Sequence, residues 1–369
     1  MSKKSLKHFA AIIALSASVA LPLTSVIANE TSPANAAENY GNDPKLISAL
    51  IDELNQHYVF ADKAKKIDKA LRQHLRQGAY RDVADGEKLA ALLTEHLQKE
   101  TQDIHLQVEF SEDVLPLPNP DGKPSAEEQA EEREMLKALN YGVERVERLP
   151  FNIGYLDLRG FAPAHDATAA LSSAMTLLTH SNALIIDLRK NGGGEPSSVA
   201  MLASYFFDER THLVDTYFRA GDRTEQTWSS EYVAGSKYGQ QKDVYILISK
   251  DSFSAAESFS YMMKNLHRAT LIGERSGGGA HPGDFVRLND HFQVFVPNGR
   301  SLSPITKTNW EAVGVAPDIA APAATALQTA QLNYLSKQLA AEKNPGRVKR
   351  LQTRIAKLEA EIAAETAAP

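Results

Sequence analysis

The chain of 369 residues contains no cysteine. This absence excludes disulfide bonds, thiolate metal sites, a cysteine nucleophile and lipid attachment to a cysteine. It is compatible with export to an oxidising compartment. The sequence also lacks a His-Glu-x-x-His helix and a dense Asp/Asn loop, so no metal is expected. We expect no other cofactor.

A strong charge of one sign is missing as well. Lysine and arginine number 40 against 46 aspartates and glutamates, which gives a net charge of −6 and a pI near 6.0. Nucleic-acid binding usually requires a basic field, so nucleic acid is not an expected partner. The hydrophobic content of 43% is that of an ordinary globular protein.

Long hydrophobic runs are confined to the N-terminus. Lysines at positions 3, 4 and 7 precede an apolar run from Phe9 to Ala28. This layout predicts a signal peptide over 1–28, with cleavage after Ala28 or as late as Ala36. The alternative is a retained membrane anchor, which Ser and Pro within the run disfavour. Residues 29–42 are predicted to be a disordered leader, and no transmembrane span is expected in the mature protein.

Apolar residues recur at helical spacing between 43 and about 99. The pattern predicts an N-terminal domain of about three helices over 43–110, ending in a short strand with His105 at its mouth. Four prolines between Leu115 and Ser125, and an acidic helical stretch after them, indicate a linker or lid over 111–148. The acidic charges are expected to solvate an exposed face.

Strands and helices alternate over 149–322, which predicts an α/β domain with a mostly parallel sheet and crossover helices. A hairpin is expected over 284–296. Residues 323–369 are predicted to form a helical hairpin, with a coiled-coil oligomerisation arm as the alternative.

Two motifs in the α/β part carry the chemistry. A buried strand from Ala183 runs into Asn191-Gly192-Gly193-Gly194, where backbone N–H groups can face a ligand. A second strand leads to Ser252-Phe253-Ser254-Ala255-Ala256-Glu257, which places a serine at a strand-to-helix turn. Together they offer donors for an oxyanion and a hydroxyl nucleophile. A serine there can equally be an N-cap, and Ser252 and Ser258 are the weaker nucleophile candidates.

These motifs, with Asn309-Trp310-Glu311 and the stretch to Ile319, resemble the C-terminal-processing (tail-specific) serine protease family over roughly 43–321. The similar branch is that of interphotoreceptor retinoid-binding protein-like hydrolases and the tricorn core. The resemblance implies a crotonase-like catalytic domain with Ser254 as nucleophile. It also implies an oxyanion hole from Gly193 or Gly194 with Ala255.

The general base departs from part of this family. Many members place a lysine about 25 residues after the serine, where this chain has Gly279. The resemblance to the tricorn branch suggests His105 as base and Glu311 as the carboxylate that orients it. His281 is the alternative base, or a residue that lines the substrate site. Imidazole titrates near neutrality, and an acceptor on its second nitrogen fixes the tautomer.

The leading hypothesis is an exported serine peptidase, periplasmic or secreted, that acts on peptides or polypeptide tails. The alternative is a catalytically weak or inactive protein of the same fold that binds a hydrophobic small molecule or a peptide. An acyl-CoA enzyme would fit the fold but not the signal peptide. About forty residues separate Phe110 from Leu149, too few for the peptide-binding domain that many processing proteases insert there. The sequence leaves the oligomeric state open.

Overall fold

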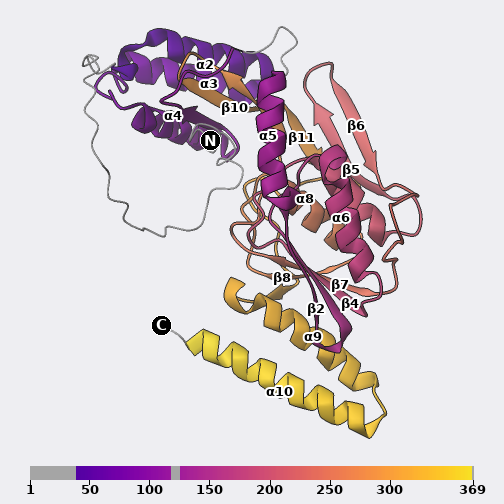
Figure 1. Cartoon of the computed structure of the whole chain (residues 1–369). Coiled ribbons are helices and arrows are strands. Elements are labelled where there is room, and N and C mark those ends of the chain that lie inside the picture. Colours follow the sequence, from indigo (N-terminus) through magenta and orange to yellow (C-terminus); the bar gives the residue numbers. More distant parts are fainter. Residues whose placement is uncertain (1–38, 118–124, 368–369) are drawn as a thin grey trace, which may run out of the picture.

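The protein is described by a computed structural model that covers residues 39–117 and 125–367 (Figure 1). The predicted signal peptide, most of the predicted leader and residues 118–124 of the predicted lid lie outside the described residues. Among the described residues, no helix is both long and apolar enough to cross a membrane.

Three helices make up most of the N-terminal part, as the apolar periodicity predicts, and they pack against a small antiparallel sheet. The helices are α2 (Pro44–His57), α3 (Ala61–Arg76) and α4 (Gly86–Thr101), after a short turn η1 (Tyr40–Asn42). Asp43 and Asp85 cap α2 and α4 by accepting backbone N–H groups. The predicted strand is β1 (Gln107–Phe110), and it directly follows the His105 loop.

The partners of β1 come from a distant part of the chain. β1 pairs with β10 (Phe292–Pro297), which pairs with β9 (Gly283–Arg287) in the predicted hairpin. Phe292, Val294 and Val296 of β10 are buried in one cluster with the apolar faces of α2, α3 and α4. In Figure 1 the orange hairpin accordingly lies among the indigo helices. The N-terminal core is therefore completed by residues almost 200 positions later.

The central sheet has six strands in the order β12-β8-β7-β4-β3-β2. All neighbours are parallel except the edge pair β2 and β3. The strands are β2 (Val143–Leu149), β3 (Ile153–Leu158), β4 (Ala183–Asp187), β7 (Asp243–Ile248), β8 (Thr270–Gly273) and β12 (Ile319–Ala320). Strand β2 lies inside the stretch interpreted from the sequence as linker. Its exposed Glu and Arg positions hid the strand pattern, because one face of this edge strand is solvated.

Helices cover both faces of this sheet. One apolar cluster joins it to α6 (Ala164–Leu178), α7 (Pro196–Ala203), η4 (Ser204–Phe206) and α8 (Ala255–Asn265). The other face packs against α9 (Ala326–Ala341) and α10 (Pro345–Ala367), with α10 lying on α9, and the short η5 (Ala323–Thr325) contacts both helices. In Figure 1 the yellow helices form the predicted C-terminal hairpin. The observed α/β architecture agrees with the sequence prediction.

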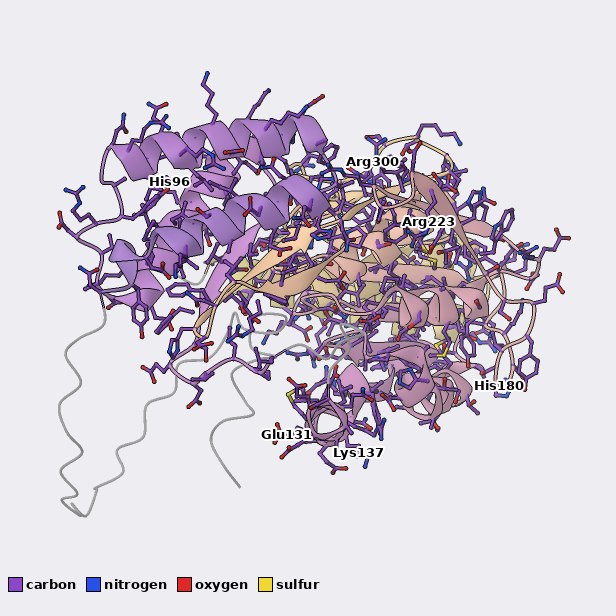
Figure 2. All side chains as sticks on the ribbon, turned by 90° about the horizontal axis from the view of Figure 1, so that it is seen from above. His96, Glu131, Lys137, His180, Arg223 and Arg300 are labelled. Atoms are coloured by element: carbon purple, nitrogen blue, oxygen red, sulfur yellow. The ribbon has the colours of Figure 1, made fainter. Side chains whose placement is uncertain are left out.

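Two remaining units flank the sheet. Strands β5 (His212–Phe218), β6 (Arg223–Trp228) and β11 (Gly299–Leu302) form a separate antiparallel sheet. Helix α5 (Ala126–Ala138) begins at a capping box made by Ser125 and Glu128, and it is followed by the short turns η2 (Asn140–Gly142) and, after β2, η3 (Pro150–Asn152). Glu131 and Lys137 of α5 project outward in Figure 2, as expected for charges that solvate a face.

Candidate active site

Ser254 lies in the loop between the end of β7 and the first residue of α8. Its φ of 52° and ψ of −113° are a strained conformation for a residue with a side chain. The loop is tied to its neighbour because Phe253 N–H donates to the Asn191 carbonyl at 3.0 Å. Such an over-determined turn presents the serine at the N-terminus of a helix, where a developing negative charge is stabilised.

The alternative serine Ser252 has a different role. It is fully buried, and its hydroxyl donates to the Leu188 carbonyl at 2.7 Å and accepts from Ser249 N–H at 3.0 Å. These bonds join the loop after β7 to the loop after β4. Ser252 is therefore a structural residue that holds the two candidate motifs together.

The glycine turn faces the serine as the motif predicts. A Cβ added to Gly193 would lie 2.8 Å from the Cβ of Ser254 and 3.1 Å from the nitrogen of Ala255. Gly193 donates its N–H to Asn191 Oδ1 at 2.9 Å. Within the described residues, no acceptor is assigned to the amides of Gly194 and Ala255. The close approach requires glycine, since any side chain at 193 would collide with the serine.

His105 packs against the residue before the serine. Its ring centroid lies 4.6 Å from that of Phe253 and 5.7 Å from that of Phe295. Its Nδ1 is buried and has no hydrogen-bond partner among the described residues. Burial lowers the pKa of His105 to about 4, although the nearby charge of Asp103 opposes this shift. The imidazole is thus neutral at ordinary pH.

Glycine at position 279 leaves the space that the His105 ring occupies beside Phe253. A Cβ built on Gly279 would lie 2.4 Å from Cε1 of His105 and 2.4 Å from Cζ of Phe253. A side chain at position 279 and the observed imidazole cannot both be present. His105 therefore occupies the space into which a side chain at 279 would extend.

Glu311 does not pair with His105 in the structure, although the sequence analysis expected it to orient that residue. Glu311 Oε2 lies 3.4 Å from His281 Nδ1 and accepts the Ala280 N–H at 2.5 Å. Its Oε1 is buried without a partner among the described residues. Burial and the nearby charge of Asp103 raise the pKa of Glu311 to about 7.

Asp103 is a connecting residue that the sequence analysis did not single out. Its Oδ2 accepts from His281 Nδ1 at 2.7 Å and from the Tyr58 hydroxyl at 3.0 Å, while Oδ1 accepts the His105 N–H at 3.2 Å. Burial alone would raise its pKa, but the bond and charge of His281 hold the pKa below its ordinary value. The Asp-x-His spacing was the available signal, because a carboxylate two residues before a histidine can bond its backbone.

Asp103, His281 and Glu311 are the described residues that could together hold a cation, since one ligand atom from each lies within 4.8 Å of the others. The 2.7 Å contact between His281 Nδ1 and Asp103 Oδ2 is the length of a direct charge-assisted hydrogen bond. That bond fills the space between the two atoms. The cluster is therefore a hydrogen-bonded junction between the N-terminal part and the α/β part of the chain.

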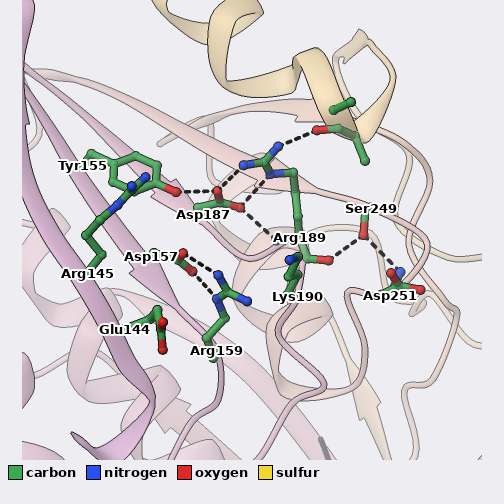
Figure 3. Close-up of a pocket in the computed structure, with 12 residues that line it drawn as sticks. Glu144, Arg145, Tyr155, Asp157, Arg159, Asp187, Arg189, Lys190, Ser249 and Asp251 are labelled. Atoms are coloured by element: carbon green, nitrogen blue, oxygen red, sulfur yellow. Dashed lines mark hydrogen bonds and ion pairs between the residues drawn. The ribbon is translucent and has the colours of Figure 1, made fainter. Parts of the chain in front are cut away.

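A cavity of about 490 Å³ lies apart from these residues, at the carboxyl ends of β3 and β4 (Figure 3). Two parallel Asp-Leu-Arg segments form much of it, with Arg159 paired to Asp157 and Arg189 paired to Asp187. The Ser249 hydroxyl donates to the Arg189 carbonyl at 2.6 Å. The cavity walls thus brace the loop that leads to the glycine turn.

Comparison with known proteins agrees with this architecture. Residues 152–321 match peptidase family S41, and residues 41–149 match the N-terminal domain of this family in eukaryotic IRBP. The chain belongs to peptidase family S41. The second match extends through the stretch 111–148, which the sequence analysis treated as a separate linker.

Individual relatives are distant. The S41 chain is 26% identical over 168 residues to carboxyl-terminal-processing peptidase 3, chloroplastic, of Arabidopsis thaliana, covering 45% of this chain and 31% of that protein. A lipoprotein from Streptococcus agalactiae shares the fold with a TM-score of 0.52 at 16% identity, and the match covers 82% of this chain and 98% of the lipoprotein chain. Mature CPAF, solved with lactacystin, has a TM-score of 0.51 at 12% identity, and the match covers 79% of this chain and 97% of the CPAF chain. The structural likenesses show the fold alone.

Proposed function

We propose that this chain is an exported serine peptidase with Ser254 as nucleophile and His105 as general base. The observation that carries the proposal is the placement of His105 against Gly279 and Phe253. Where many family members have a lysine, this chain has a glycine, and a neutral imidazole fills the adjoining space. Membership of the S41 family, a family of serine peptidases, supports the same reaction class.

In the proposed reaction the Ser254 Oγ attacks the carbonyl carbon of a peptide bond while His105 takes the hydroxyl proton. The resulting imidazolium then gives that proton to the leaving amine, and an acyl-enzyme remains. Water deprotonated by His105 hydrolyses the ester and regenerates the serine. The low pKa of His105 keeps the imidazole neutral and able to accept a proton at the start of the cycle.

The amides of Gly194 and Ala255 are the proposed oxyanion donors. Gly193, whose N–H is engaged by Asn191, is the residue that allows the turn to approach Ser254. Helix α8 adds the positive end of its dipole. Two such donors stabilise negative charge on the tetrahedral intermediate and typically contribute several kcal/mol each.

Asp103, His281 and Glu311 are proposed to position the base rather than to act on substrate. Asp103 holds the backbone of His105 and bonds His281, which also contacts Glu311. His281 is the alternative base, since it has the paired carboxylates that His105 lacks. Comparing His105→Ala with His281→Ala decides between them.

Export and a peptide substrate complete the proposal. The N-terminal basic and apolar run supports export. The description of the Arabidopsis relative as a carboxyl-terminal-processing peptidase supports peptides or polypeptide tails as substrates.

A ligand-binding protein without turnover is the second candidate. The observation that favours it is the buried Nδ1 of His105, which has no hydrogen-bond partner in the described part of the chain, together with its pKa of about 4. A histidine with so low a pKa is a weak base, and none of the described residues accepts a hydrogen bond from this Nδ1 to fix the tautomer. Such a protein would bind a peptide or a hydrophobic molecule without hydrolysing it.

The test uses the mature protein with a diverse peptide library read by mass spectrometry, beside labelling by a fluorophosphonate serine reagent. The peptidase proposal expects Ser254→Ala to abolish labelling and to lower cleavage at least about a thousandfold. His105→Ala should approach the same loss, with His281→Ala retaining more activity. Full cleavage by Ser254→Ala would refute the assignment, and binding without labelling would favour the second candidate.

A further inference from the structure

Glu257 is a buried carboxylate that the proposed reaction does not use. It lies three residues after Ser254, in the first turn of α8, and none of its surface is exposed. A buried carboxylate without a cation needs several hydrogen-bond donors to remain ionised. The donors around Glu257 therefore show what its charge is used for.

Four donors converge on its two oxygens. Oε2 accepts the N–H of Ser254 at 2.9 Å and of Gly279 at 2.8 Å. Oε1 accepts the hydroxyl of Ser276 at 2.5 Å and the N–H of Gly278 at 2.7 Å. A protonated acid would carry a hydroxyl hydrogen that faces only donors, so the arrangement is that of a carboxylate.

Helix capping explains only one of these bonds. A glutamate at the third helical position commonly reaches back to the N-cap N–H, as Glu257 does to Ser254. The other three bonds go to the turn 276–279, which belongs to another part of the chain and carries the glycine beside His105. One carboxylate thus joins the backbone of the nucleophile to the backbone that borders the base.

We propose that Glu257 is a positioning residue whose carboxylate holds Ser254 in its strained conformation and fixes its position relative to Gly279, which borders His105. The proposal rests on the proposed peptidase function. Protonation of Glu257 would release Ser254 N–H or one of the turn donors, and the serine would relax from its positive φ. The reactive geometry would then exist only while the carboxylate is ionised.

The charge of Glu257 is expected to be lost near neutral pH. Burial raises the pKa of Glu257 to about 7, and the four donors oppose that shift. The other titratable groups around this point are Glu311, whose pKa is also raised to about 7, and His105 beyond Gly279. A pH profile alone cannot separate Glu257 from Glu311, whereas Ser276 donates its hydroxyl to Glu257 specifically.

The experiment measures the rate of labelling by a fluorophosphonate between pH 5 and 9, since this rate reports an activated serine without knowledge of the substrate. In the wild type the rate should fall about tenfold per pH unit below about 7. Glu257→Gln should lower the rate at pH 8 by about ten- to a thousandfold and remove that pH dependence. Glu274→Gln is the matched control, because Glu274 lies near the same turn but its carboxylate accepts the Ala323 N–H, and this variant should behave as the wild type.

Ser276 variants keep the proposal testable if Glu257→Gln does not fold. Ser276→Ala removes a donor that lowers the Glu257 pKa, so the fall in labelling rate at acid pH should begin at a higher pH. Ser276→Thr keeps the hydroxyl and should leave this fall at the wild-type pH. An unchanged pH profile of Ser276→Ala, or wild-type labelling by Glu257→Gln, overturns the positioning role. Wild-type labelling of Ser254→Ala would instead refute the peptidase proposal itself.

Discussion

Position 279 bears on the proposed role of His105 as base. A side chain there would project toward His105 and Phe253. Glycine leaves that volume to an imidazole delivered by the N-terminal part of the chain. The imidazole of His105 at its observed place therefore requires glycine at position 279.

The expected effect of Gly279→Ala follows from this packing. The added methyl group would meet both rings at 2.4 Å and displace the imidazole by a fraction of an ångström or more. A displaced base should lower serine labelling by about a hundredfold. Gly160→Ala is the control, because its added Cβ would meet only the Gly193 carbonyl oxygen, at 3.9 Å. Equal labelling of the two variants would contradict the role given to position 279.

At the scale of elements, two adjacent parallel strands of the six-stranded sheet, β3 and β4, end in the same way. β3 and β4 are in register, with Asp157 opposite Asp187, and each aspartate is followed two residues later by its arginine. Arg189 also donates to the Ala323 carbonyl of η5, which ties the strand end to the C-terminal helices. The loop that carries the glycine turn thus begins from a fixed point.

Arg189→Met should destabilise the fold by about 3 kcal/mol, because Asp187, with 5% of its side chain exposed, would lose its counter-charge. The measurement is the free energy of unfolding from a urea titration. Arg223→Met on β6 is the matched control, since Arg223 and Glu225 have the same spacing but side chains 51% and 57% exposed. That change should cost under about 1 kcal/mol. Equal costs would show that burial of the pair contributes nothing.

At the scale of the whole molecule, the N-terminal helices depend on the late hairpin. Phe292, Val294 and Val296 are at most 1% exposed and lie in one buried cluster with the apolar faces of α2, α3 and α4. Removing them would uncover the apolar faces of all three helices. The N-terminal part is thus a spatial unit but not a sequence unit.

An isolated fragment of residues 39–149 should accordingly retain helix content but lose cooperative unfolding. Circular dichroism during a urea titration would detect this. The same fragment with 283–297 attached through a glycine–serine linker supplies the missing strands and should regain a sigmoidal transition. A cooperative transition in the shorter fragment would show that the hairpin is dispensable.

The sequence predicted most of this architecture because long periodic segments carry their own signal. The strands before Ser254 and the glycine turn, the helix after the serine, and the hairpin were all found from apolar patterns. Strand β2 was missed because one of its faces is solvated. The pairing of β1 with β10 could not be predicted, since alternation of apolar residues does not name a partner strand.

For the candidate site as well, local motifs could be predicted from the sequence and contacts between distant loops could not. Ser254 and the glycines lie on local motifs, and the structure places them together. The contacts of Glu311 with His281, and of Asp103 with both histidine segments, depend on how loops from three distant regions meet. Sequence spacing does not determine contacts between distant loops, so Glu311 could be predicted as a site residue but its partner could not.

The packing of the hairpin β9–β10 into the N-terminal part also sets the order in which the site can fold. A chain leaving the ribosome or an export channel N-terminus first presents the strand with His105 long before β10 has emerged. The serine loop can form on its own sheet while that histidine is still unanchored. The proposed pairing of Ser254 with His105 should therefore form only when residues near 297 are free to fold.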